Sequence, residues 1–204
     1  MVRVPWLEPG IIMKALDAGA YGVICPMINT AEQAAQLVSY VRYPPLGVRS
    51  FGPTRASISA GANYGVEAND SILCFAMIET RQAMENLAEI CATPGLDGVY
   101  IGPADLTIGL TGMRYPTGFD REEPEMIEAI KHILTTAHAH GVKAALHCGS
   151  ARYAVRAIGW GFDMVTLAND VRMITNASSA ALTEVRSGLV SAALDLPTGA
   201  GCQY

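Results

Sequence analysis

Six short apolar runs occur along the chain. Within each run, apolar residues follow one another directly and do not alternate with polar ones, which is typical of parallel strands covered on both faces. We therefore expect six parallel β-strands. The runs cover residues 2–6, 21–27, 72–79, 98–102, 143–148 and 163–168.

Between these runs, apolar residues recur at helical spacing. The stripe within 34–41 follows Thr30 and Gln33, which have the spacing of a capping box. By contrast, the glycine-rich segment 44–70 predicts a long irregular loop. Further helices are expected within 10–18, 83–91, 126–137 (closed by Gly141), 150–159 and from Asp170 to about Leu194.

Alternating strands and helices predict an α/β fold, either a doubly wound sheet or a (β/α)₈ barrel. Polar or conformationally special residues cluster at strand carboxyl ends, which favours a (β/α)₈ TIM-barrel type. No Gly-x-Gly-x-x-Gly follows the first strand, so a dinucleotide site is not supported. Because the chain shows about six of the eight expected units, we expect the N-terminal units to be missing. Residues 1–195 are predicted to form this single partial barrel, and 196–204 a flexible tail.

Composition narrows the possible partners. Half of the 204 residues are hydrophobic, 16% are charged, and the net charge is −5 without a basic block, which argues against nucleic acid as a partner. No apolar run approaches the roughly 18–20 residues of a membrane span. The five cysteines are scattered and form no C-x-x-C, as expected of a reduced, cytoplasmic protein.

Two acids stand at the ends of apolar runs. Glu79 ends the run 72–79, and Asp105 follows Gly102 and Pro103. Buried carboxylates are costly unless they are paired or bound to a metal, and two of them suit a hard divalent cation. Alternatively, Glu79 complements the dipole of the next helix, and Asp105 is a capping or turn residue.

Two cationic or titratable residues are further candidates. Arg49 lies in the glycine-rich segment Gly47–Gly52 and could offer its guanidinium to a substrate carboxylate or enolate, or be a solvated loop residue. His147 ends a strand and could act as an acid or base, or be structural. Although Cys148 is adjacent, neighbouring strand residues point to opposite faces, so a catalytic dyad is not expected.

Several short motifs occur together in a characteristic order. They are YPPLGVRS at 43–50, IETR at 78–81 and GPADL at 102–106, with RVPW at 3–6 and VICPM at 23–27. Together they resemble the HpcH/HpaI aldolase family, which includes 4-hydroxy-2-oxoheptanedioate aldolases, macrophomate synthase and relatives of the citrate lyase β-subunit. The resemblance covers nearly the whole chain to about residue 180.

This resemblance implies a (β/α)₈ barrel and a class II aldolase that cleaves or forms 4-hydroxy-2-oxo acids through a metal-stabilised pyruvate enolate. It implies that Glu79 and Asp105 bind Mg²⁺ or Mn²⁺, with Co²⁺ as a further option. Arg49 matches the arginine that stabilises oxyanion charge, and the backbone of Ala104, with Asp105, holds the 2-oxo acid. The resemblance also implies a homo-oligomer.

Two departures from the family pattern bear on activity. Met77 stands where several of these aldolases have a substrate-binding glutamine, and the family's general-base histidine has no counterpart in this chain. Two alternatives therefore stay open. One is a CoA-thioester lyase of the citrate or malyl type, and the other is a catalytically impaired, shortened barrel.

Overall fold

The computed structural model describes residues 1–194, with side chains described to residue 189. The chain divides into two compact units, Met1–Leu167 and Ala168–Tyr204. The domain predicted for residues 1–195 thus spans the first unit and much of the second. The predicted tail, 196–204, lies outside the described residues.

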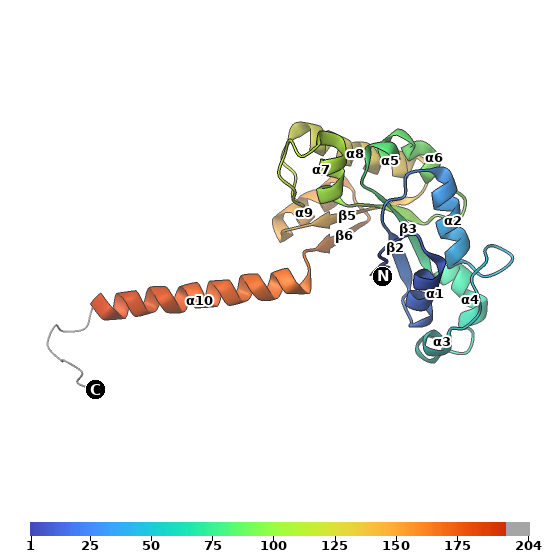
Figure 1. Ribbon diagram of the computed structural model, residues 1–204, viewed down its shortest axis with the longest axis horizontal. Coiled ribbons are helices and arrows are strands. Elements are labelled where there is room, and N and C mark those ends of the chain that lie inside the picture. The colour runs from blue at the N-terminus through green and yellow to red at the C-terminus, as the bar shows by residue number, and fades with distance from the viewer. Residues whose placement is uncertain (195–204) are drawn as a thin grey trace. The chain divides into compact units, whose positions relative to one another are not determined.

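The first unit is built on one parallel sheet whose strand order equals the chain order. Each strand pairs with the next one along the chain, so the six expected strands are confirmed. The result is an α/β fold with a curled, six-stranded half-barrel (Figure 1). The strands are β1 (Val2–Arg3), β2 (Gly22–Cys25), β3 (Leu73–Ile78), β4 (Gly98–Ile101), β5 (Lys143–Cys148) and β6 (Met164–Leu167).

Helices connect successive strands, as parallel pairing requires. They begin where the sequence supplies caps: the side chains of Thr30, Thr80 and Ser150 each accept a bond from a first-turn N–H. The helices are α1 (Pro9–Asp17), α2 (Ala31–Val41), α3 (Thr54–Ala60), α4 (Tyr64–Ser71), α5 (Arg81–Glu85), α6 (Leu87–Cys91), α7 (Pro103–Thr111), α8 (Pro124–Ala139) and α9 (Ala151–Trp160) in the first unit, and α10 (Asp170–Leu194) in the second.

The two faces of the sheet have separate apolar clusters, because successive strand residues point to opposite sides. In β3, Cys74 and Ile78 join the large cluster between the sheet and the helices. Phe75 and Met77 instead join a small cluster on the other face, within the curl. We call this second face the inner face; its cluster also includes Ile24, Tyr100, Ala145 and, at its edge, Met164.

Two aspartates fix strand register at the amino-terminal ends of the strands. Asp97, just before β4, accepts a hydrogen bond from the N–H of Cys74 at 2.7 Å and pairs with Arg42 at 2.8 Å. Asp163, just before β6, accepts from the N–H of Ala144 at 2.9 Å. Both carboxylates therefore tie a strand to the one before it.

Three local expectations are corrected by the structure. The segment 44–70 is not an irregular loop throughout, because it contains helices α3 and α4. The stripe at 83–91 forms two short helices that meet at Asn86. Helix α7 was not expected, because its glycines at 109 and 112 weaken the helical pattern; Pro103 nevertheless starts it, and Gly112 ends it in the left-handed conformation.

The second unit begins with the expected helix. Asn169 caps α10 by accepting a bond from the N–H of Arg172 at 2.9 Å. Several apolar side chains of α10 are exposed within the described residues, and most recur at spacings of three or four. They are Val171, Met173, Ile174, Leu182, Val185 and Leu189.

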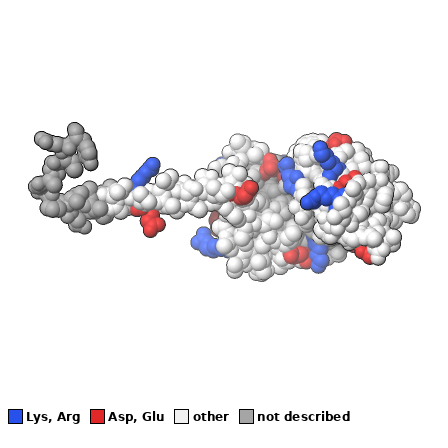
Figure 2. Space-filling view, turned by 90° about the horizontal axis from the view of Figure 1, so that it is seen from below, with Lys and Arg blue, Asp and Glu red and all other residues white. Residues whose placement is uncertain are grey.

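Surface chemistry is mixed. Acidic and basic side chains are scattered among uncharged ones on the face shown in Figure 2. No helix in the described part of the chain has the length and hydropathy needed to cross a bilayer. Four of the five cysteines (25, 74, 91 and 148) are buried and free, while Cys202 lies outside the described residues.

Candidate active site

Glu79 is buried at the carboxyl end of β3. Its side chain continues the inner face past Phe75 and Met77, and the residue is only 2% exposed. Oε1 accepts a hydrogen bond from the N–H of Met27 at 2.8 Å, whereas Oε2 is buried without a hydrogen-bond partner. Burial raises the pKa of Glu79, the Met27 bond lowers it, the charge of Asp105 raises it and that of Arg3 lowers it, with a net increase.

The loop after β2 presents a backbone N–H to Glu79. Met27 has a φ of 58°, a conformation uncommon for a residue other than glycine. Asn29 stabilises this turn by donating to the Met27 carbonyl at 3.0 Å and accepting a bond from Thr80. Asn86 in turn donates to the Asn29 carbonyl at 2.8 Å. Thr80, just before α5, and Asn86, just after it, thus hold the loop that supplies the Met27 N–H.

Asp105 and Ala104 lie in the first turn of α7, directly after β4. Asp105 is exposed, and its charge acts on Glu79, so the two predicted metal ligands lie near each other at the ends of adjacent strands. The helix-dipole alternative for Glu79 is not supported by its contacts, since Thr80 caps α5. For Asp105, a first-turn position also suits the dipole, so that interpretation is compatible with the structure.

The donor set fits a divalent cation. A buried carboxylate oxygen without a partner is unusual and calls for an ion or water. Gly102 leaves room beside it, because a Cβ at that position would lie 2.5 Å from Oε2 of Glu79. Among the described residues, no three His, Cys, Asp or Glu side chains converge on one point. Two carboxylates, completed by substrate and water, are a set that Mg²⁺ accepts.

Arg49 does not lie beside Glu79 and Asp105. It is 2% exposed, and Nη2 contacts Asp17 Oδ1 at 2.8 Å and the Tyr64 hydroxyl at 3.1 Å. Its guanidinium also lies 4.4 Å from the centroid of the Tyr43 ring. Asp17 ends α1, which precedes the amino end of β2, whereas Glu79 follows the carboxyl end of β3. The structure therefore does not bring Arg49 to the two acids.

Arg3 is the arginine that the structure brings near Glu79. It pairs with Ile24 of β2, whose side chain lies on the inner face, so Arg3 shares that face. Its charge acts on both Glu79 and Cys25. Sequence reasoning did not single out Arg3, although Arg3 is the last residue of β1. That position is the signal that could have identified it.

His147 lies on the inner face of β5. Nδ1 is 3.1 Å from the Tyr100 hydroxyl and 2.9 Å from Oγ1 of Thr166, and these two hydroxyls also bond to each other. We call these three residues the inner polar cluster. Cys148 is fully buried in the cluster on the other face, which confirms that it forms no dyad with His147. Burial raises the pKa of Cys148 to about 11, so it is a poor nucleophile.

A well-anchored loop, residues 112–123, lies beside His147. The Phe119 ring meets the His147 ring edge-on, with centroids 4.4 Å apart. Next to it, Asp120 accepts bonds from the Gly149 N–H at 2.7 Å and the Ser150 hydroxyl at 2.6 Å.

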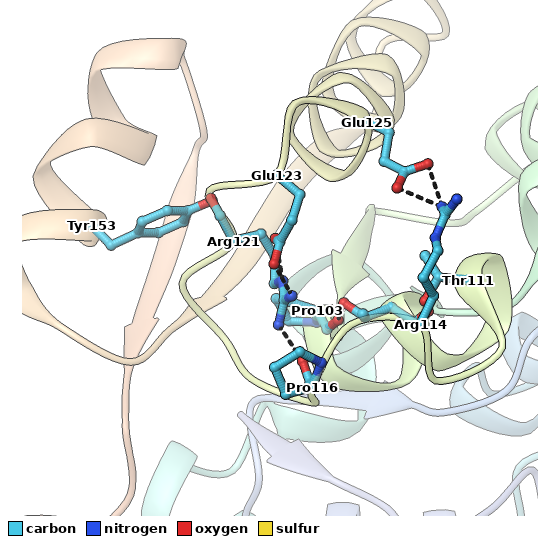
Figure 3. A network of polar contacts seen from close by, with 9 residues as sticks. Pro103, Thr111, Arg114, Pro116, Arg121, Glu123, Glu125 and Tyr153 are labelled. Atoms are coloured by element: carbon cyan, nitrogen blue, oxygen red, sulfur yellow. Dashed lines mark hydrogen bonds and ion pairs between the residues drawn. The ribbon is translucent and has the colours of Figure 1, made fainter.

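Figure 3 shows how the rest of the loop is held. Arg121 bonds to Glu123 and to the Pro116 carbonyl, and the Tyr153 hydroxyl donates to the Arg121 carbonyl at 2.9 Å. Arg114 reaches both carboxylate oxygens of Glu125, at 2.5 and 2.7 Å. The loop therefore gives Phe119 a fixed position beside the imidazole.

Comparisons with known proteins identify the family of this chain. A hydroxypyruvate/pyruvate aldolase of Rhizorhabdus wittichii is 42% identical over 91% of this chain and 73% of its own length. A 5-keto-4-deoxy-D-glucarate aldolase of Shigella dysenteriae is 33% identical over 87% of the chain and 68% of its length. A Burkholderia cenocepacia HpcH/HpaI aldolase/citrate lyase family structure superimposes with a TM-score of 0.79 at 30% identity, covering 91% of this chain and 73% of that one. The HpcH/HpaI aldolase/citrate lyase family model matches residues 1–177, and the chain belongs to that family.

Proposed function

We propose that the protein is a divalent-metal-dependent class II aldolase that cleaves or forms 4-hydroxy-2-oxo acids, with a pyruvate-type 2-oxo acid as one partner. Family membership carries the coarser statement, that the chain is an enzyme of the aldolase and lyase class. The observation that carries the finer one is the buried, unpartnered Oε2 of Glu79 beside Asp105.

In this proposal, Glu79 and Asp105 hold Mg²⁺ or Mn²⁺, and Co²⁺ is a further candidate. The ion, when bound, supplies Lewis-acid stabilisation of the negative charge that develops on the 2-oxo acid. Met27 holds Glu79 in place through Oε1 and leaves Oε2 for the ion. The polar groups around these acids then orient the substrate.

Two groups suit the negative charge of the substrate. Ala104 occupies the first turn of α7, where backbone N–H groups have no partner within the helix, so it can donate to the carboxylate of the 2-oxo acid. Arg3 shares the inner face and supplies positive charge near Glu79. We assign to Arg3 the stabilisation of oxyanion charge that the sequence assigned to Arg49.

The experiment is isothermal titration of Mn²⁺, with and without pyruvate, into the wild type and Asp105→Ala. We expect binding that pyruvate strengthens and that the substitution weakens at least tenfold, because one of two charged ligands is lost. Absence of binding to the wild type would contradict the proposal. Malyl-CoA and a simple 4-hydroxy-2-oxo acid, offered side by side, separate the aldolase from a CoA-thioester lyase.

We further propose that the half-barrel is of the (β/α)₈ type and that the protein is a cytoplasmic homo-oligomer. The strand order and the family support the barrel. The exposed apolar side chains of α10 support self-association, since such stripes are normally covered. Light scattering coupled to gel filtration tests this; a monomer at micromolar concentration would contradict it.

A further inference from the structure

Glu79 is held by a turn with an unusual backbone conformation. The turn comprises residues 27–29, and Met27 has a φ of 58°. Residues that carry a side chain rarely adopt this left-handed conformation unless their surroundings stabilise it. In this conformation, the N–H of Met27 donates to Oε1 of Glu79 at 2.8 Å. The contact to Glu79 therefore depends on the groups that stabilise the turn.

Asn29 is the residue that stabilises the turn. Its Nδ2 donates to the Met27 carbonyl at 3.0 Å, and its Oδ1 accepts a bond from the Thr80 hydroxyl. Its backbone N–H donates to Oε1 of Gln33 at 2.6 Å, and its carbonyl accepts from Nδ2 of Asn86 at 2.8 Å. All four polar groups of Asn29 thus have partners, which lie in the turn, in α2 and on both sides of α5.

These bonds form a closed ring of contacts that includes Glu79. The Glu79 carboxylate bonds to Met27, and Met27 bonds to Asn29. Asn29 in turn bonds to Thr80, the residue that follows Glu79 in the chain. Ile28, which is fully buried in the main apolar cluster, anchors the turn from within. The carboxylate and the backbone that carries it are therefore fixed to the same turn.

The ring of contacts makes the two carboxylate oxygens of Glu79 unequal. Oε1 already accepts the bond from the Met27 N–H, whereas Oε2 is buried without a hydrogen-bond partner. Oε2 also lies against Gly102, where an added Cβ would be 2.5 Å away. A carboxylate held in this way offers one oxygen to a cation more readily than both.

The number of oxygens that a carboxylate offers distinguishes between divalent cations. Mg²⁺ requires near-ideal octahedral geometry, keeps several waters and takes few carboxylate oxygens. Ca²⁺ is larger, takes about six to eight oxygen ligands and often binds both oxygens of one carboxylate. A glutamate restricted to a single oxygen therefore favours Mg²⁺ over Ca²⁺.

We propose that Asn29 is a positioning residue that makes the site selective for Mg²⁺ over Ca²⁺, by holding Oε1 of Glu79 on the Met27 N–H. The inference rests on the proposed function, since it concerns the cation of the same site. Asn29 acts through Met27 and does not bind the cation. Residues that orient a metal ligand in this way typically change metal affinity by about 10–100-fold, which is readily measured.

The test is isothermal titration of Mg²⁺ and of Ca²⁺, each alone, into the wild type and Asn29→Ala. We expect the substitution to lower the affinity for Mg²⁺ about tenfold, because Glu79 loses its fixed position. The affinity for Ca²⁺ should change by no more than about twofold, because the released Oε1 gives Ca²⁺ a second oxygen. The ratio of the Mg²⁺ affinity to the Ca²⁺ affinity should therefore fall about fivefold or more.

Thr30→Ala is the matched control, since Thr30 is next to Asn29 in the chain. The substitution removes the cap of α2, a 3.3 Å bond from the Gln33 N–H, and leaves the four bonds of Asn29 in place. Loss of a cap lowers stability, so the melting temperature should fall while the affinity ratio stays unchanged.

A second variant serves if Asn29→Ala does not fold. Thr80→Val removes the partner of Asn29 Oδ1 together with the cap of α5, and it should lower the affinity ratio in the same direction. Thr80→Ser keeps the hydroxyl and should restore the ratio. Because Thr30→Ala measures the effect of losing a cap alone, the two consequences of Thr80→Val can be separated.

Equal losses of affinity for the two ions, or no loss for either, would overturn the inference and leave Asn29 a structural residue. A wild type that binds Ca²⁺ as tightly as Mg²⁺ would also overturn it, but would leave the proposed function standing. A wild type that binds neither Mg²⁺ nor Mn²⁺ would instead contradict the proposed function, and the inference with it.

Discussion

Glu79 and Gly102 directly follow the neighbouring strands β3 and β4, and the Glu79 carboxylate occupies the space that a side chain at Gly102 would fill. A Cβ on Gly102 would lie 2.5 Å from Oε2 of Glu79 and 2.8 Å from the terminal methyl of Met77. Oε1 is meanwhile fixed by the Met27 N–H. The glycine is therefore as much a part of the site as the acid.

Replacing this glycine should damage metal binding. In Gly102→Ala, the Met77 methyl can move aside, but Glu79 must leave its position, so we expect Mn²⁺ affinity to fall at least tenfold. Overpacking of this kind also costs about 1–3 kcal/mol of stability. Titration calorimetry and thermal melting measure both effects.

A matched control is Gly159→Ala in α9, where the added Cβ meets nothing within 4 Å. It should leave metal binding unchanged and stabilise the helix by roughly 0.5–1 kcal/mol. Unchanged affinity in Gly102→Ala would show that Glu79 does not need its present position to bind the ion.

Removing the charge of Glu79 should separate stability from binding. Burial raises the pKa of Glu79, so the folded protein without metal binds this proton more tightly than the unfolded chain does. Ionising the carboxylate therefore lowers the stability of the folded protein as pH rises from 4.5, the ordinary pKa of a glutamate, through the raised pKa of the folded state. Without metal at pH 8, the free energy of unfolding of Glu79→Gln should exceed that of the wild type by about 1 kcal/mol. Near pH 4 the two proteins should be equally stable.

With Mn²⁺ present, the wild type should be more stable than Glu79→Gln, because only the wild type gains the stabilisation of a bound ligand. Glu85→Gln, at an exposed position of α5, serves as the control. An equal response of Glu79→Gln and wild type to Mn²⁺ would refute the ligand assignment.

Arg49 should matter for stability and not for the chemistry. Arg49→Met leaves Asp17 without its partner and removes the cation from the Tyr43 ring. We expect a loss of about 2 kcal/mol or more, measured by urea unfolding, since breaking a buried pair is more costly than replacing it whole. Pyruvate-dependent Mn²⁺ binding should persist below the melting temperature, and its selective loss would instead restore the catalytic role predicted from the sequence.

Asp163 should make the stability of the fold decrease at acid pH. Burial favours a higher pKa for Asp163, but the Ala144 N–H, His138 and Lys143 outweigh it and lower the pKa to about 2, from 3.8. A depressed carboxyl pKa contributes stability that is complete above the unfolded value and is lost as pH falls through the folded one.

Asp163→Asn should therefore lower stability by about 1 kcal/mol at pH 7, a value reduced for solvent screening. The difference from wild type should shrink between about pH 4 and pH 2. Denaturant titrations across this range test the expectation; a difference independent of pH would mean that the aspartate acts without its charge.

The strands were predicted well because each of them lies within an apolar run that is at least as long as the strand. Helix α2 was predicted equally well, since Thr30 supplies the capping group and the stripe is regular. Helices α3, α4 and α7 were missed because they are short and contain glycine or proline or are flanked by them, so their local pattern resembles a loop. Their helical form depends on tertiary packing, as at Tyr64, which is 3% exposed.

For the site, position at a strand end was informative and loop composition was not. Glu79 and Asp105 were predicted as ligands because an acid after a buried run is unusual, and the structure places them near each other. Glycines around Arg49 indicate close approach without showing to what, and the structure places its guanidinium beside Asp17 and Tyr64. The inner polar cluster joins three strands, and such a juxtaposition follows only from the register.

The aspartates at the amino ends of the strands have a consequence for how this fold can change over generations. Asp97 and Asp163 fix register at one end of the sheet, whereas Glu79, Gly102 and His147 lie at the other. Mutations that alter substrate preference can therefore accumulate at the carboxyl ends without shifting any strand. Such a separation lets selection explore new chemistry while the inherited scaffold stays the same.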